Sequence, residues 1–160
     1  MKFKKLVQLY ETPFTKRAGP PYIEIDNKGN KRYFKDRGHS ILHRTEKDPE
    51  TGLTLPAVER ADGTKFWFIN GRRHRDEIDP KTYISLPAIE YSNGDKCWYK
   101  DHKRDRTDGP AIVWENGNEE WWINDIPLTS KQIKELKEKI EMKKKIFTSD
   151  NPLSSLQDLF

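Results

Sequence analysis

Three stretches of this chain place the same residue types at the same distances from a glycine. Relative to Gly63, Gly94 and Gly117, a Pro-Ala pair begins seven residues earlier, a tryptophan follows four residues later, and Asn or Asp follows seven residues later. The three tryptophans are Trp67, Trp98 and Trp121. Residues 21–38 form a degenerate first copy, in which Tyr33 replaces the tryptophan and one extra residue precedes the glycine. Such self-similarity indicates a small structural unit that is stable only when its copies stack against one another.

Each copy has the pattern of a β-hairpin. Ala88–Tyr91 alternates apolar and polar residues, Ser92–Asp95 contains the turn dipeptide Asn-Gly, and Lys96–Lys100 is a second strand segment. Asn-Gly and Asp-Gly favour hairpins because their turns need backbone with positive φ. Successive side chains of a strand point to opposite faces, so equivalent positions form rows across the copies. The rows are Val58, Ile89 and Ile112; the three tryptophans; and, on the reverse face from the tryptophans, Phe68, Tyr99 and Trp122.

The composition explains why aromatic residues recur in so polar a chain. Only 33% of the residues are hydrophobic and 35% are charged, whereas apolar residues, Gly included, make up about 45–50% of a typical globular domain. Aromatic side chains bury about 150–250 Å² each, so they supply the buried area that the few aliphatic residues do not. We therefore predict a mostly β protein, in which residues 19–128 form an elongated antiparallel sheet of about four stacked hairpins. The repeat prolines lie 35, 31 and 23 residues apart, and we expect inserted loops within 38–54 and 72–85.

Residues 129–147 change to a helical pattern without Gly or Pro. Thr129 followed by Gln132 is a capping box, and apolar residues recur on one face of the expected helix. These residues are Ile133, Leu136, Ile140 and Phe147. The apolar stripe would close the last hairpin and leave the many lysines in solvent. Alternatively, Lys143, Lys144 and Lys145 contact the phosphates of a nucleic acid.

The histidines and carboxylates do not form a recognisable catalytic arrangement. His43 and His74 occupy comparable places in their copies, which favours a structural role in which the ring donates to a carbonyl of a neighbouring turn. The sequence has no glycine-rich phosphate loop, no Gly-x-Ser-x-Gly motif and no metal-ligand spacing. We therefore expect no catalytic residue, no metal and no cofactor, and a protein that is not an enzyme. A minor alternative is a metal-dependent nuclease site built from His102, Asp105 and Asp108.

Residues 19–128 resemble a known degenerate repeat. The motif Asp-Gly-Pro-Ala…Asn-Gly…Trp…Asn, seen at 108–124, and the His-Arg that follows Asn70-Gly71 resemble repeats of many phage, giant-virus and bacterial proteins. Those repeats are similar to MORN repeats, which implies hairpins stacked into an extended, twisted sheet. The resemblance also implies a non-enzymatic, phage-encoded module that binds a host or phage protein, with interference with a host process or defence system as one role. The sequence departs from the pattern at Asp105-Arg106, where His-Arg is expected.

Charge, cysteine content and hydropathy bound the class of protein. The net charge of +4, from 30 basic and 26 acidic residues, does not by itself demand a nucleic-acid partner. Cys97 is the only cysteine, so no internal disulfide forms and a reducing compartment fits. No apolar run approaches the roughly 20 residues of a membrane span, and residues 1–18 lack the apolar core of a signal peptide. We expect a cytoplasmic protein without a membrane partner, located in the host cytoplasm if a phage encodes it.

Residues 148–160 combine a polar spacer with an apolar and acidic segment. The last six residues, Ser-Leu-Gln-Asp-Leu-Phe, resemble the C-terminal peptides by which phage and bacterial replication proteins bind sliding clamps. The sequence departs from the bacterial peptide in having Leu156 where Gln begins it. The resemblance implies that four residues contact the clamp: Leu156, Asp158, Leu159 and Phe160. The alternative is that the two leucines and Phe160 pack on the protein's own sheet.

Deletion of Leu156–Phe160 separates these alternatives. We expect the shortened chain to lose binding to a sliding clamp and to keep its thermal midpoint, because the anchors would contact the partner and not the core. The affinity of the full chain should be micromolar, since ordering the segment offsets much of the gain from apolar burial. A deletion that lowers the free energy of unfolding by several kcal/mol would place these residues in the protein's own core.

Overall fold

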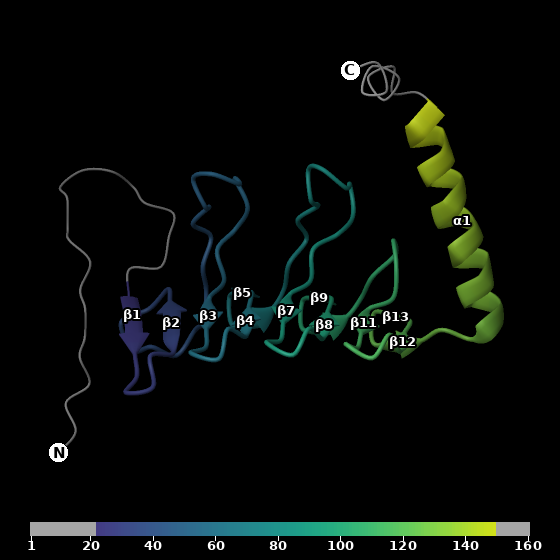
Figure 1. Cartoon of the computed structure of the whole chain (residues 1–160). Helices are drawn as coiled ribbons and strands as arrows, with labels where there is room; N and C mark the ends of the chain where they lie inside the picture. Colours follow the sequence, from purple (N-terminus) through teal and green to yellow (C-terminus); the bar gives the residue numbers. More distant parts are fainter. Residues whose placement is uncertain (1–21, 150–160) are drawn as a thin grey trace.

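The computed structural model describes residues 22–149, with side chains up to residue 145. Four hairpins stand side by side along one line (Figure 1) and form one antiparallel sheet of eight strands, in the order β1-β2-β3-β4-β7-β8-β11-β12. The hairpins are β1 (Tyr22–Ile25) with β2 (Lys31–Phe34), β3 (Val58–Glu59) with β4 (Lys65–Phe66), β7 (Ile89–Glu90) with β8 (Lys96–Cys97), and β11 (Ile112–Val113) with β12 (Glu119–Glu120). The helix α1 spans Ser130–Ser149. The predicted mostly β fold, with four stacked hairpins and a helix, is confirmed.

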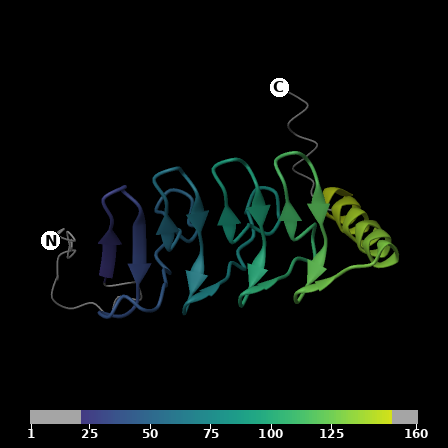
Figure 2. The same ribbon diagram turned by 90° about the horizontal axis from the view of Figure 1, so that it is seen from below.

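Each of the last three units also carries a second, smaller hairpin that we did not predict. The expected strand Lys96–Lys100 is interrupted at Trp98, and β9 (Tyr99–Lys100) pairs with β10 (Lys103–Arg104) instead of continuing β8. The equivalent hairpins are β5 (Phe68–Ile69) with β6 (Arg72–Arg73), and β13 (Trp122–Ile123) with β14 (Ile126–Pro127). In Figure 2 these small hairpins lie in a second row beside the first.

Two-residue turns with positive φ connect the strands of these small hairpins. The turn residues are Asn70-Gly71, Asp101-His102 and Asn124-Asp125, and all six have positive φ. Positive φ at both central residues is the requirement of a type I′ turn, whose twist matches that of the flanking strands. Asn70-Gly71 is the strongest short-range signal for such a turn, so this sequence feature could have revealed the second hairpin.

The turns of the large hairpins place their glycine at positive φ, as expected, and form a loop of three residues. The N–H of Gly63 donates to the carbonyl of Arg60 at 3.0 Å, and the N–H of Arg60 donates to the carbonyl of Thr64 at 2.9 Å. This pattern is a three-residue loop in which only the glycine has positive φ, 93° at Gly63. Asp26, Gly29 and Asn30 repeat the same bonds in the first hairpin, so the extra residue of that copy lies outside its turn.

Each of the two longer spacings between repeat prolines contains a loop with the same backbone shape, which we call an excursion. Residues 47–54 and 78–85 both leave the sheet and return, and an isolated bridge joins the ends of each. Gly52 and Tyr83 occupy equivalent positions with φ of 69° and 58°. Arginines 31 residues apart mark the unit: Arg44, Arg75 and Arg106. The expected insertions are therefore parts of a repeat, and the 23-residue spacing belongs to a unit that lacks an excursion.

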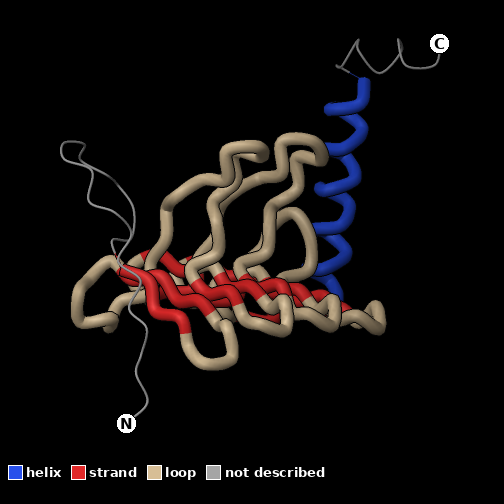
Figure 3. The backbone as a smooth tube through the Cα atoms, turned by 60° about the vertical axis from the view of Figure 1, so that its left-hand side comes forward, coloured by secondary structure: helices blue, strands red, loops and turns tan. Residues whose placement is uncertain are grey.

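The sheet has two faces of different composition. The inner face is the one from which the excursions and α1 rise (Figures 1 and 3). It holds a cross-strand ladder of alternating charge: Lys31, Glu59, Lys65, Glu90 and Lys96. It also holds the buried rings Tyr33, Trp67, Trp98 and Trp121. The outer face, opposite, holds an apolar ladder: Val58, Phe66, Ile89, Cys97 and Ile112.

Alanines allow neighbouring hairpins to approach closely. Ala57, Ala88 and Ala111 are each 0% exposed, and each carbonyl accepts the backbone N–H of the ring residue in the preceding hairpin, at 2.8–2.9 Å. A larger side chain at these positions would push the hairpins apart, which explains the recurring Pro-Ala pair. Ile89, at the centre of the outer apolar ladder, is 1% exposed and packs with Cys97 and Ile112.

The helix α1 begins where the sheet ends. The side-chain oxygen of Gln132 accepts the N–H of Thr129 at 2.9 Å, and the Thr129 hydroxyl accepts the N–H of Gln132 at 3.4 Å, which confirms the capping box. Three residues of the predicted apolar stripe are half-buried: Ile133, Leu136 and Ile140. The side chain of Phe147, the fourth, lies outside the described part of the chain.

Candidate functional site

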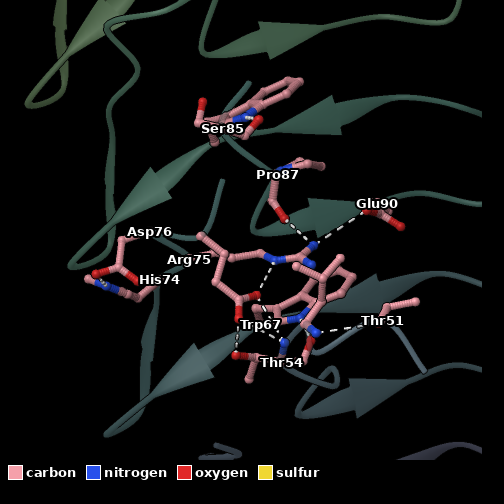
Figure 4. Close-up of polar contacts among 12 residues, drawn as sticks. Thr51, Thr54, Trp67, His74, Arg75, Asp76, Ser85, Pro87 and Glu90 are labelled. Atoms are coloured by element: carbon pink, nitrogen blue, oxygen red, sulfur yellow. Dashed lines mark hydrogen bonds and ion pairs between the residues drawn. The ribbon is translucent and has the colours of Figure 1, made fainter. Parts of the chain in front are cut away.

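One arginine in each of the first three units packs on the inner face and joins two hairpins. The guanidinium of Arg75 lies 4.0 Å from the centre of the Trp67 ring of its own unit. Its Nη1 donates to the carbonyl of Pro87 in the next hairpin at 3.2 Å, and its Nε donates to Glu77 at 3.2 Å (Figure 4). Glu90 lies 3.6 Å away as a second carboxylate. The side chain is only 5% exposed, so its charge is balanced within the protein.

The same contact recurs along the array. Arg44 covers Tyr33 at 3.6 Å and donates to the carbonyl of Pro56, and Arg106 covers Trp98 at 3.8 Å and donates to the carbonyl of Pro110. Burial lowers the pKa of Arg75 and of Arg106, while their carboxylate neighbours oppose that change. We call Arg44, Arg75 and Arg106 the inner arginines. Because these contacts recur from hairpin to hairpin, we infer that the inner arginines hold the repeats together.

The histidines have the structural place that we predicted, but with the opposite hydrogen-bond direction. Nδ1 of His43 accepts the backbone N–H of Asn70, and Nδ1 of His74 accepts that of Asp101, each at 3.1 Å. Both bonds hold the small turn of the next hairpin. At the third position, Oδ1 of Asp105 accepts the N–H of Asn124 at 3.4 Å. The position therefore requires an acceptor, which explains why Asp can replace His there.

The residues of the minor nuclease hypothesis serve three different partners. His102 accepts the N–H of Arg73 at 3.4 Å, and Asp105 accepts the N–H of Asn124. Asp108 accepts the N–H and hydroxyl of Ser85, each at 2.6 Å, and pairs with Arg106 at 2.7 Å. Burial would raise the pKa of Asp108, but the bonds from Ser85 and Arg106 outweigh it, and the pKa is lowered. Within residues 22–149, no group of three His, Cys, Asp or Glu side chains could hold a metal ion.

Other predicted contact residues lie at or beyond the end of α1. Lys143, Lys144 and Lys145 are exposed helical residues, and Lys144 pairs with Glu141 at 2.9 Å. Leu156, Asp158, Leu159 and Phe160 lie outside the described residues, so their predicted contact with a clamp stays a prediction.

The outer face carries a second series of arginines and rings that sequence reasoning did not identify as a unit. Arg73 lies 4.5 Å from the Tyr99 ring, and Arg104 lies 3.5 Å from the Trp122 ring. Cross-strand pairing adds Phe68 opposite Arg73 and Tyr99 opposite Arg104. Arginines and rings therefore alternate along the second row of hairpins.

Exposed aromatic rings also lie on the outer face, along the edge of the apolar ladder that is opposite the second row of hairpins. Tyr91 and Trp114 occupy equivalent positions in consecutive units, three residues before the turn glycine, and each is 38% exposed. The Tyr91 ring meets Phe66 edge-on at 6.0 Å, and Arg60, at the equivalent position of the preceding unit, covers Phe66 at 4.9 Å. We define the outer patch as Arg60, Phe66, Arg73, Tyr91 and Trp114.

The outer patch differs from the enclosed part of the inner face. The inner face has a recess of about 30 Å³ beside Trp67, Arg75 and Glu77, which is too small for anything but water. Burial raises the pKa of the Cys97 thiol, beneath the outer patch, to about 11, so this thiol is protonated at neutral pH.

Among residues 22–149, no helix is long and apolar enough to cross a membrane.

Three comparisons with known proteins found no relative of this chain. No protein-family model, no curated protein and no solved structure matches the chain. The outer patch is therefore proposed as the functional surface on its geometry alone.

The accepting role of His43 makes stability depend on pH. Burial lowers the pKa of His43, and the charge of Lys35 lowers it further. The folded state thus favours the neutral ring, and this contribution is complete above the unfolded pKa, about 6.5. It is lost as the pH falls from there toward the lower folded pKa.

We expect His43→Asn to reduce the loss of stability on acidification, because an Asn oxygen can accept the same N–H without titrating. Urea unfolding of both proteins at neutral pH and at about pH 5.5 measures this difference. If the two proteins lose the same free energy between the two pH values, His43 does not accept the Asn70 N–H as a neutral ring.

Proposed function

We propose that this protein is a non-enzymatic binding module that presents its outer patch to a protein partner. The observation that carries the proposal is the combination of two exposed rings, Tyr91 and Trp114, with arginines already stacked on neighbouring rings. Trp, Tyr and Arg are the residues that contribute most binding energy at protein interfaces. A role in interference with a host process or defence system rests only on the resemblance to phage repeats.

The patch is suited to binding because its two arginines are already stacked on rings before a partner arrives. Phe66 and Tyr99 hold the guanidiniums of Arg60 and Arg73, and strand pairing fixes the backbone of Phe66 and Arg73. Ordering a long side chain at an interface costs about 0.5–1.5 kcal/mol. Side chains that are already held lose less freedom, so more of the contact energy appears as affinity.

Nucleic-acid binding is the second candidate function. It would use Lys143, Lys144 and Lys145 as phosphate contacts and the exposed rings as stacking platforms for bases. The exposure of the three lysines supports this alternative. Binding to phosphates weakens steeply as salt rises because counterions are released, so salt dependence separates the two candidates.

Affinity capture from the cells that produce the protein tests the proposal. The tagged chain is compared with the double variant Tyr91→Ala, Trp114→Ala, and retained proteins are identified by mass spectrometry. We expect a discrete protein that the wild type retains and the double variant loses, because truncating such ring residues typically costs 1 kcal/mol or more each, roughly tenfold or more in affinity for the pair.

Tyr83→Gly is the matched control, because it removes an exposed ring from the opposite side of the sheet. Tyr83 is 59% exposed, and glycine already occupies the equivalent position in the first excursion. This variant should retain the partner. Loss of the partner from Tyr83→Gly but not from the double variant would move the binding surface to the excursions. Retention that disappears on nuclease treatment and at high salt would favour the nucleic-acid alternative.

A further inference from the structure

Two arginines of the outer patch lack the carboxylate partner that other stacked arginines have. Arg44, Arg75, Arg104 and Arg106 each form a salt bridge of 3.2 Å or shorter. Arg60 and Arg73 form none within the described part of the chain. The side-chain contact of Arg73 with a polar group is to His102, at 3.2 Å between Nη2 and Nε2.

The charges of these two arginines both reach the exposed ring of Tyr91. Arg60 covers Phe66, and Phe66 meets the Tyr91 ring edge-on. Arg73 covers Tyr99. Tyr99, like Phe66, packs against the apolar ladder at Ile89, Cys97 and Ile112. Burial raises the pKa of the Tyr91 hydroxyl, and the charges of Arg73 and Arg60 both oppose this rise. Tyr91 is therefore an exposed ring within the field of two arginines that form no salt bridge within the described residues.

We infer that the site formed by Arg60, Tyr91 and Arg73 binds an acidic segment of the partner protein, with carboxylates at the two guanidiniums and an apolar side chain on the ring. This inference rests on the proposed protein-binding function. A guanidinium whose face lies on a ring still offers its N–H edge, which matches the geometry of a carboxylate. Charge complementarity therefore favours a binding partner that carries carboxylates.

The charges around the site favour a short acidic segment over a nucleic-acid strand. Toward the first hairpin, the outer face carries Glu24 and Asp26 beside Arg32. Toward the last hairpin, it carries Glu120, which follows Ile112 in the apolar ladder, and Asp125, which pairs with Arg104. A polyphosphate lying along the sheet would meet carboxylates on both sides of the arginines. A short acidic segment centred on Tyr91 would lie between these two groups of carboxylates.

A fluorescein-labelled peptide of Glu-Glu-Phe repeats is the probe, and a Gln-Gln-Phe peptide of equal length is its neutral counterpart. Fluorescence anisotropy with the full chain should show up to about tenfold tighter binding of the acidic peptide, the effect expected from two exposed charge contacts together. The double variant Arg60→Gln, Arg73→Gln should bind the two peptides equally. Arg60→Lys, Arg73→Lys, which keeps the charge, should retain part of the preference.

The controls keep the result interpretable. Arg72→Gln removes a neighbouring exposed arginine whose side chain alternates to the other face of β6, and it should leave the preference intact. The single variant Arg60→Gln changes an exposed residue and, with an unchanged thermal midpoint, should lower the preference without unfolding the chain.

Failure of this inference is distinguishable from failure of the proposed function. If wild type does not prefer the acidic peptide, or if Arg60→Gln, Arg73→Gln keeps the preference, the inference is wrong. The function would still stand if the captured partner is lost on replacing Tyr91 and Trp114. Tighter binding of a single-stranded oligonucleotide than of the acidic peptide would overturn the inference in favour of a nucleic acid.

Discussion

The array depends on the contact between an inner arginine, the ring that it covers and the proline carbonyl that it bonds. Arg75 covers Trp67 in its own hairpin and donates to Pro87 in the next. Because each contact spans two units, it orders the stack in a way that a single hairpin, marginal in water, cannot achieve alone. A chain with few aliphatic residues thus forms a core from cation–π contacts, paired arginines and closely fitted alanines.

The same contact explains how the array ends. Trp67 and Trp98 each donate the indole N–H to a carbonyl of an excursion, at Thr54 and Ser85. No excursion precedes Trp121, and its indole N–H bonds to the Glu119 carboxylate at 3.2 Å instead. Lys137 of α1 then lies 5.0 Å from the Trp121 ring, where another unit would supply an arginine. The helix therefore occupies the place of the next repeat.

Sequence reasoning reached the stacked hairpins and the helix because their signals are local: turn glycines, alternating side chains and a capping box. It placed Trp67, Trp98 and Trp121 in one buried row, at 6–8% exposure. It missed the second hairpins because it did not use the turn signal of Asn70-Gly71, and because no propensity marks the break of the strand at each tryptophan. It missed the outer patch because Arg60, Arg73 and Tyr91 meet only through the register of separate strands. The direction of the His43 bond also depended on which group of the next turn faces the ring.

We assign the inner arginines to stability, and we propose that Arg60 and Arg73 serve binding. The inner arginines pair with carboxylates of the inner face, whereas Arg60 and Arg73 form no salt bridge within the described residues. The most direct measurement of this account is the free energy of urea unfolding of Arg75→Ala against Arg72→Ala. The account predicts a loss of about 3 kcal/mol for Arg75→Ala, because Glu77 and the Pro87 carbonyl lose their hydrogen-bond donor, and a change within about 0.5 kcal/mol for exposed Arg72→Ala. A loss for Arg75→Ala no larger than for Arg72→Ala would contradict it.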